Sequence, residues 1–117
     1  MVYGLSVSHT GVADEGELIR LTGDLDHVTL PTFERKAVTL VGSGATRVVL
    51  DLSAVGFIDS SGLSGIIELF HRLKLSGGRL GVICPDGGPR RIFERTGVGA
   101  LLGISRTRDE AVASLRA

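Results

Sequence analysis

Two adjacent serines are the residues whose type and position could do chemistry. Ser60 and Ser61 follow Asp59 and precede Gly62, where apolar residues begin to recur at helical spacing. A hydroxyl at such a point can accept a phosphoryl group, because unpaired backbone N–H groups and the helix dipole favour an anion at a helix N-terminus. A phosphoserine would present roughly −1.5 to −2 charge to any protein docking there. The spacing therefore permits a charge switch.

A helical projection distinguishes the two serines. At about 100° per residue, Ser61 falls nearly opposite the middle of the apolar arc, and Ser60 falls near its edge. We therefore expect Ser61 to be the exposed hydroxyl, and Ser60 to turn toward a sheet or to cap the helix. Asp59 could cap the helix or orient a serine hydroxyl, and capping is favoured. From these residues alone, capping without regulation is the simpler interpretation.

The surrounding elements predict an α/β fold. The pattern indicates strands over residues 2–10, 17–22, 48–50, 79–84 and 102–105, and helices over 31–41, 60–76, 89–96 and 108–115. The strand–helix–strand unit over 47–84 predicts parallel strands with a right-handed crossover. The opening hairpin, with its turn at 14–16, adds an antiparallel partner. We expect a mixed sheet with helices packed against it, and Ser61 on the same rim as the loop over 23–27.

Length and charge limit the classes of function. The chain has 117 residues, 43% of them hydrophobic, and its 13 basic and 13 acidic side chains give no net charge. This balance disfavours nucleic acid or an electrostatic membrane surface as a partner. The single cysteine, Cys84, rules out an internal disulfide and is expected in the core. No membrane span or signal peptide is apparent, so we expect one cytoplasmic domain over 1–117.

Catalysis is the first alternative, and the motifs for it are absent. The chain has no Gly-x-x-x-x-Gly-Lys phosphate loop and no Gly-x-Ser-x-Gly around any serine. Serine hydrolysis would need a histidine brought to Ser61 by the fold, and His27 is the only fair candidate. The three histidines share no spacing for a metal site. We therefore expect no enzyme activity, no catalytic residue, no metal and no cofactor.

The segment Asp59-Ser60-Ser61-Gly62-Leu63, following 48–53, resembles the signature of the STAS domain of bacterial anti-sigma factor antagonists. Similarity continues in order over residues 21–26, 77–80, 91–97 and 109–111, and so covers nearly the whole chain. The resemblance implies an α/β STAS-like sandwich in which about four helices pack against a mixed β-sheet.

The resemblance also implies a function. An antagonist of this family, when unphosphorylated, binds an anti-sigma factor and so frees a sigma factor for transcription. The partner is a serine kinase with a histidine-kinase-like ATPase fold, and it releases the antagonist after phosphorylating the second serine of the motif, here Ser61. A metal-dependent serine phosphatase acts on the phosphorylated form. The alternative is a STAS scaffold or adaptor subunit of a signalling assembly or lipid transporter.

The expected partner surface surrounds Ser61. It comprises Asp24, Asp26, His27, Asp59, Ser60, Ser61, Gly62 and Ser64. Asp24 is the preferred neighbour of Ser61. The loop over 23–27 has an alternative interpretation, a solvated turn with local Asx-type hydrogen bonds.

Overall fold

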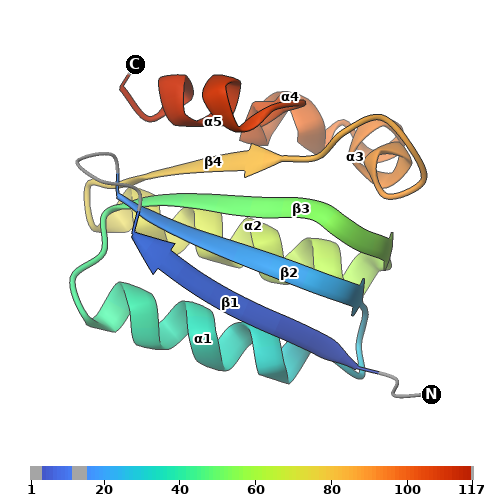
Figure 1. Ribbon diagram of the computed structural model, residues 1–117, viewed down its shortest axis with the longest axis horizontal. Helices are drawn as coiled ribbons and strands as arrows, with labels where there is room; N and C mark the ends of the chain where they lie inside the picture. The colour runs from blue at the N-terminus through green and yellow to red at the C-terminus, as the bar shows by residue number, and fades with distance from the viewer. Residues whose placement is uncertain (1–3, 12–15, 117) are drawn as a thin grey trace.

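The fold is built on one five-stranded sheet with the order β1-β2-β3-β4-β5 (Figure 1). The computed structural model describes residues 4–11 and 16–116; part of the first predicted strand and of the 14–16 turn lies outside them. The strands are β1 (Leu5–Gly11), β2 (Glu17–Leu25), β3 (Arg47–Ile58), β4 (Arg79–Ile83) and β5 (Ile104–Ser105). β1 pairs with β2 antiparallel, and the other three pairings are parallel. The predicted mixed sheet is confirmed.

β3 is much longer than the predicted strand over 48–50, so that prediction is wrong in extent. It continues to Ile58 because β2 runs beside it as far as Leu25. Asp51 consequently lies inside the strand and is buried. Two register irregularities interrupt the β2–β3 ladder. Such bulges break the alternation of apolar and polar residues that a sequence pattern depends on, which is why the second half of β3 looked like a connection.

The described residues form five helices that pack on the sheet, one more than predicted. They are α1 (Leu30–Gly42), α2 (Ser60–Leu75), α3 (Arg90–Thr96), α4 (Val98–Leu102) and α5 (Arg108–Ser114). The unpredicted helix is α4. Gly97, with φ 74°, closes α3 as predicted, and Gly103, with φ 66°, closes the following turn of helix. Because α4 takes up residue 102, the predicted strand over 102–105 shrinks to two residues.

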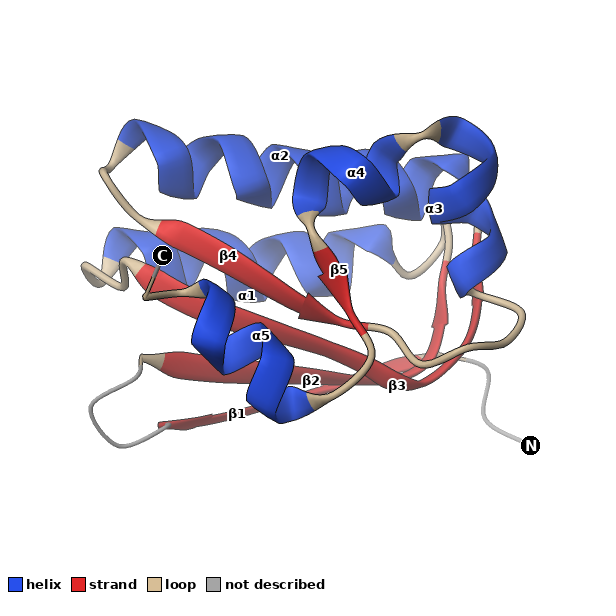
Figure 2. Ribbon diagram, turned by 90° about the horizontal axis from the view of Figure 1, so that it is seen from above, coloured by secondary structure: helices blue, strands red, loops and turns tan. Residues whose placement is uncertain are grey.

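The helices cover both faces of the sheet unequally (Figure 2). The main core lies between the sheet and α1 to α4, and includes Phe33, Leu50, Ile66 and Phe93. A smaller cluster lies on the other face, where α5 packs on β3 and β4; its buried members are Val49, Ile83, Ala111 and Leu115. Among residues 4–11 and 16–116, no helix has the length and apolar character needed to cross a bilayer.

This topology brings the ends of two strands and the starts of two helices together at one end of the sheet. The carboxyl ends of β2 and β3 meet there because the two strands are parallel, and α1 and α2 both begin there (Figure 1). In open α/β sheets, sites commonly form at such an edge.

Candidate functional site

Six of the eight predicted site residues lie in a structure that we call the rim, made of residues 24–28 and 57–61; Gly62 and Ser64 follow it in α2. Asp24 lies beside Phe57 and Leu25 beside Ile58 in the parallel ladder. The Asp59 backbone N–H then donates to the Leu25 carbonyl at 3.2 Å. The expectation that the loop after β2 and the start of α2 share one edge is confirmed.

Asp59 is the N-cap of α2, as the favoured interpretation predicted. Its backbone is extended, with φ −98° and ψ −176°, and its Oδ1 accepts the Gly62 backbone N–H at 2.8 Å. Its Oδ2 accepts the His27 backbone N–H at 3.1 Å. One carboxylate therefore satisfies an otherwise unpaired donor of the helix and also holds the loop after β2 against it.

Several effects set the pKa of Asp59. Burial disfavours the charged carboxylate, whose side chain is 25% exposed. The N–H groups of Gly62 and His27 and the His27 imidazole stabilise the charge, whereas Asp26 repels it. The stabilising contacts prevail, so the pKa of Asp59 lies below its ordinary value of 3.8. The carboxylate at the start of α2 is thus ionised at neutral pH.

The serines differ from the helical projection in their exposure. Ser60 is exposed and is not the cap, whereas Ser61 is half-buried. The projection failed because it considers only the sheet side of α2, while the loop after β2, held by Asp59, lies against the first turn. All buried side-chain polar atoms of the described residues have hydrogen-bond partners. The Ser61 hydroxyl has none there, so its oxygen is not completely buried.

Gly62 and Ser64 occupy different faces of the first turn. Gly62 is buried against β2, and a Cβ placed on it would lie 2.3 Å from the Leu25 carbonyl oxygen. It therefore permits the close approach of α2 but offers no side chain to a partner. Ser64 is exposed, and its hydroxyl donates to the Ser60 carbonyl at 3.0 Å.

The two aspartates of the 23–27 segment have distinct roles. Asp24 belongs to β2, not to a loop, and is half-buried. Asp26 is buried, and its Oδ1 accepts the backbone N–H groups of Val28 and Thr29, both at 3.0 Å. These are the local Asx-type bonds that the alternative interpretation anticipated. The side chain of Asp26 thus shapes the turn that leads into α1.

Two apolar residues of the rim were missed by the sequence analysis. Val28 is 59% exposed and Phe57 is 53% exposed. With the exposed His27, Ser60 and Ser64 they form a surface on which apolar and polar groups alternate, a composition suited to a protein partner. The sequence did contain a signal for Phe57. It is an aromatic residue two positions before Asp59, in a chain whose aromatic content is only 4%.

The contacts around Ser61 do not include the histidine base that would activate its hydroxyl as a nucleophile. The His27 imidazole faces Asp59, with 3.7 Å between Nδ1 and Oδ2, and no hydrogen bond joins it to Ser61 in the described part of the chain. Within those same residues, no group of three or more His, Cys, Asp or Glu could hold a metal ion.

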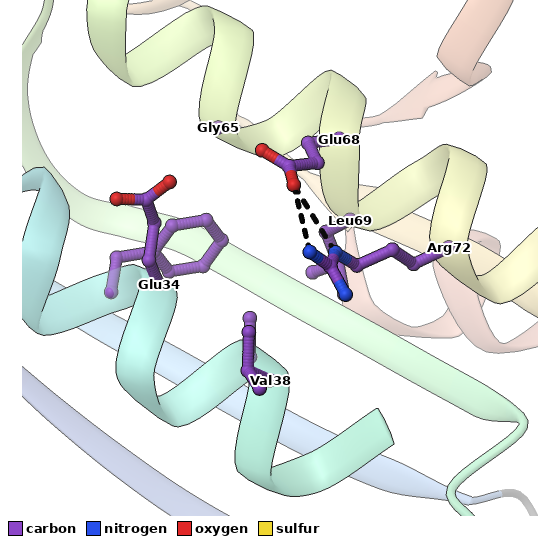
Figure 3. A pocket seen from close by; sticks show the side chains of 8 residues that line it. Glu34, Val38, Gly65, Glu68, Leu69 and Arg72 are labelled. Atoms are coloured by element: carbon purple, nitrogen blue, oxygen red, sulfur yellow. Dashed lines mark hydrogen bonds and ion pairs between the residues drawn. The ribbon is translucent and has the colours of Figure 1, made fainter. Parts of the chain in front are cut away.

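A separate small hollow lies between α1 and α2 (Figure 3). Phe33, Ala37 and Leu69 are among the residues that line it, and Arg72 pairs with Glu68 at its edge, with 3.0 Å between Nη2 and Oε1. Its volume of about 50 Å³ is far below the several hundred Å³ of typical ligand pockets. It is too small for an organic cofactor.

The fold is a small α/β sandwich, and its rim carries two adjacent serines at the start of α2. The model of the STAS domain family matches residues 10–111. The chain belongs to the STAS domain family.

Known proteins with similar sequences and structures include anti-sigma factor antagonists. The anti-sigma F factor antagonist of Lysinibacillus sphaericus is 27% identical over 106 residues, 90% of each chain. The structure of an anti-sigma factor antagonist from Mycobacterium paratuberculosis has a TM-score of 0.87 at 26% identity, covering 97% of this chain and 95% of that one. The Bacillus cell fate determinant SpoIIAA, in its phosphorylated form, has a TM-score of 0.67 at 28% identity, covering 95% of this chain and all of that one.

Proposed function

We propose that this chain is an anti-sigma factor antagonist whose binding to an anti-sigma factor is switched off by phosphorylation of Ser61. The observation that carries the proposal is the Ser61 hydroxyl, which lies in the first turn of a capped helix, without a hydrogen bond to the described residues, on the rim that also exposes Val28 and Phe57. The names of the relatives support the class of function. SpoIIAA, which has a phosphorylated form, supports the kind of regulation.

The charges of the rim explain how one phosphoryl group would release a partner. Residues 24–28 and 57–61 contain three aspartates and no lysine or arginine. A phosphate on Ser61 would be tolerated by the N-terminus of α2 but would add to this negative charge. A partner that fits the unmodified rim would meet repulsion and a desolvation cost. Each 1.4 kcal/mol of lost interaction weakens binding about tenfold.

The partner proposed here is a serine kinase with a histidine-kinase-like ATPase fold, which binds the rim and then phosphorylates it. A metal-dependent serine phosphatase would restore the binding form. This cycle requires the same hydroxyl to be reachable by two different active sites. The Ser61 hydroxyl lies in the first turn of α2, where the carboxyl ends of β2 and β3 meet, and is not completely buried, which is compatible with that requirement.

Calorimetric titration of the anti-sigma factor with serine variants tests the switch. We expect Ser61→Asp to weaken binding about 100-fold, equivalent to about 2.7 kcal/mol, and Ser61→Ala to keep near wild-type affinity. Ser60→Asp is the matched control, because Ser60 is the neighbouring and more exposed hydroxyl. A similar loss in both aspartate variants would show a general charge effect on the rim, and equal affinities of Ser61→Asp and Ser61→Ala would remove the switch.

Mapping the modified residue tests whether the anti-sigma factor phosphorylates Ser61. After incubation with the anti-sigma factor and ATP, intact mass should increase by one phosphoryl group, and fragmentation should place it on Ser61. Modification of Ser60 instead would contradict the proposal. A pull-down with the full chain tests the alternative. If it recovers scaffold or transporter subunits and no ATPase-fold kinase, the adaptor role is favoured.

A further inference from the structure

The edge of β4 is only half covered by β5. β5 pairs with Val82 and Ile83, and in the described residues no strand lies beside 79–81 on that side (Figure 2). The Arg79 backbone N–H donates to the Thr46 carbonyl at 2.7 Å, on the β3 side. Because successive residues of a strand direct their backbone groups to opposite neighbours, those of Leu80 face the uncovered edge. This edge can accept another strand.

A hollow of about 380 Å³ lies over this uncovered edge. Helices α2 and α5 both contribute to its lining, through Phe70 and Ser114 respectively, and the largely buried Leu80 and Leu102 form its floor. The volume falls within the range of ligand pockets. The hollow therefore combines the unpaired backbone groups of Leu80 with a lining of mixed polar and apolar character. Peptide-binding grooves that add a strand to a sheet use the same two features.

Two cations without an acidic partner border the hollow. Neither Lys74 nor Arg79 makes an ion pair with any described residue, and the Lys74 Nζ lies 5.5 Å from the centroid of the Phe70 ring. Arg79 also stands directly beside Arg47 in the parallel β3–β4 register. Like charges at neighbouring strand positions are unfavourable, so an anionic group bound here would relieve repulsion.

We propose that this hollow binds an extended acidic peptide segment of a partner protein, which pairs with β4 as an additional strand. Its backbone would pair with Leu80, its apolar side chains would contact Phe70 and Leu102, and its carboxylates would pair with Lys74 and Arg79. A small anion would use the charges but not the strand edge or the apolar lining. A peptide uses all three.

This site is distinct from the rim that contains Ser61. The rim is at the first turn of α2 and the hollow is at its last turn, and the 16 residues of α2 separate them by about 24 Å. A peptide bound beside β4 therefore leaves Ser61 accessible, and the two surfaces can be occupied together. Ser61→Asp should leave peptide binding at the hollow unchanged.

A short probe peptide tests strand addition directly. The probe is acetyl-Asp-Val-Asp-Val-Asp-amide, titrated to millimolar concentration into the ¹⁵N-labelled full chain. We expect shifts of the Leu80, Gly81 and Gly103 amides and slower exchange of the Leu80 amide proton. The same peptide N-methylated at all five residues keeps its charge but has no ladder N–H donor on either edge, and should bind at least tenfold more weakly. Equal binding of the two peptides, or no shift at these amides, overturns the proposal.

Charge variants and other anions complete the test. Lys74→Glu/Arg79→Glu should weaken the probe at least tenfold, whereas Arg91→Glu, an exposed charge change on α3, should leave it unchanged. The reversed peptide acetyl-Lys-Val-Lys-Val-Lys-amide should not bind. If inorganic phosphate binds the hollow as tightly as the probe, the site is an anion site and the proposal fails. It also fails if phosphatidylglycerol vesicles, and not the peptide, bind through Lys74 and Arg79.

Discussion

Asp59 accepts the backbone N–H of His27 through Oδ2 while its Oδ1 caps α2. The two residues are 32 positions apart in the chain. Their bond joins the loop after β2 to the first turn of the helix that carries Ser61. The orientation of the proposed switch residue therefore depends on a carboxylate beside it as well as on its own helix.

Removing this carboxylate should destabilise the fold. Asp59→Ala loses the cap and the bond to His27, and we expect a loss of about 1–2 kcal/mol in the free energy of unfolding, measured by urea denaturation. Asp59→Asn keeps one acceptor oxygen for Gly62 and should lose less. Asp109→Ala, an exposed change in the first turn of α5, is the control. A smaller loss for Asp59→Ala than for Asp109→Ala would contradict the role given to Asp59.

The same residue predicts a pH dependence. The folded-state pKa of Asp59 is below the unfolded value of 3.8, so its charge stabilises the fold above that value. This contribution is lost as the pH falls through the folded-state pKa. The stability difference between the native chain and Asp59→Asn should be constant over about pH 5–7 and should shrink below about pH 4. A stability difference that grows on acidification would show that the pKa of Asp59 is raised in the folded state, not lowered.

Glycines of α2 should differ in their tolerance of a methyl group. In Gly62→Ala, the added Cβ would lie 2.3 Å from a backbone oxygen, and we expect a loss of about 1–3 kcal/mol despite the better helix propensity of alanine. In Gly65→Ala the close atom is the end of the Leu30 side chain, at 2.5 Å, which can move, so the loss should be smaller.

Gly42 provides the control for this comparison. It is the last residue of α1, and a Cβ there would have no neighbour within 4 Å. Gly42→Ala should therefore be neutral or should stabilise the fold by up to about 1 kcal/mol. Thermal unfolding followed by circular dichroism would rank the three variants. A Gly62→Ala variant as stable as Gly42→Ala would mean that α2 can move away from β2 at no cost.

Phe57 should contribute to partner binding without contributing to stability. Its side chain is exposed on the rim, so Phe57→Ala should weaken binding of the anti-sigma factor about tenfold or more and leave the melting temperature nearly unchanged. Leu101→Ala is the matched control, because Leu101 on α4 is equally exposed at 53%. Equal affinities of the two variants would exclude Phe57 from the interface.

Cys84 should be unreactive in the folded chain. It is buried, and burial raises the pKa of its thiol although Arg90 acts in the opposite direction. Thiol reactivity depends on the thiolate and on access. Reaction with a disulfide reagent at neutral pH should be slow in the native state and fast in urea. Fast labelling without urea would place the thiol at the surface.

Local sequence determined the elements whose signals lie within one segment. The apolar spacing of α2, the aspartate before it and the glycines after α2 and α3 act over a few residues, through helix geometry and capping. They were sufficient to predict the βαβ unit, the mixed sheet and the N-cap at Asp59. The STAS resemblance, which the family comparison confirmed, also depends on motifs that lie within single segments.

Tertiary structure alone decided the length of β3 and the exposure of the two serines. β3 extends to Ile58 because β2 lies beside it, and no pattern within residues 51–58 specifies that neighbour. Ser61 is half-buried and Ser60 exposed, at a turn of α2 that Asp59 joins to the loop after β2. These features depend on contacts between residues distant in the chain, which a helical projection does not include.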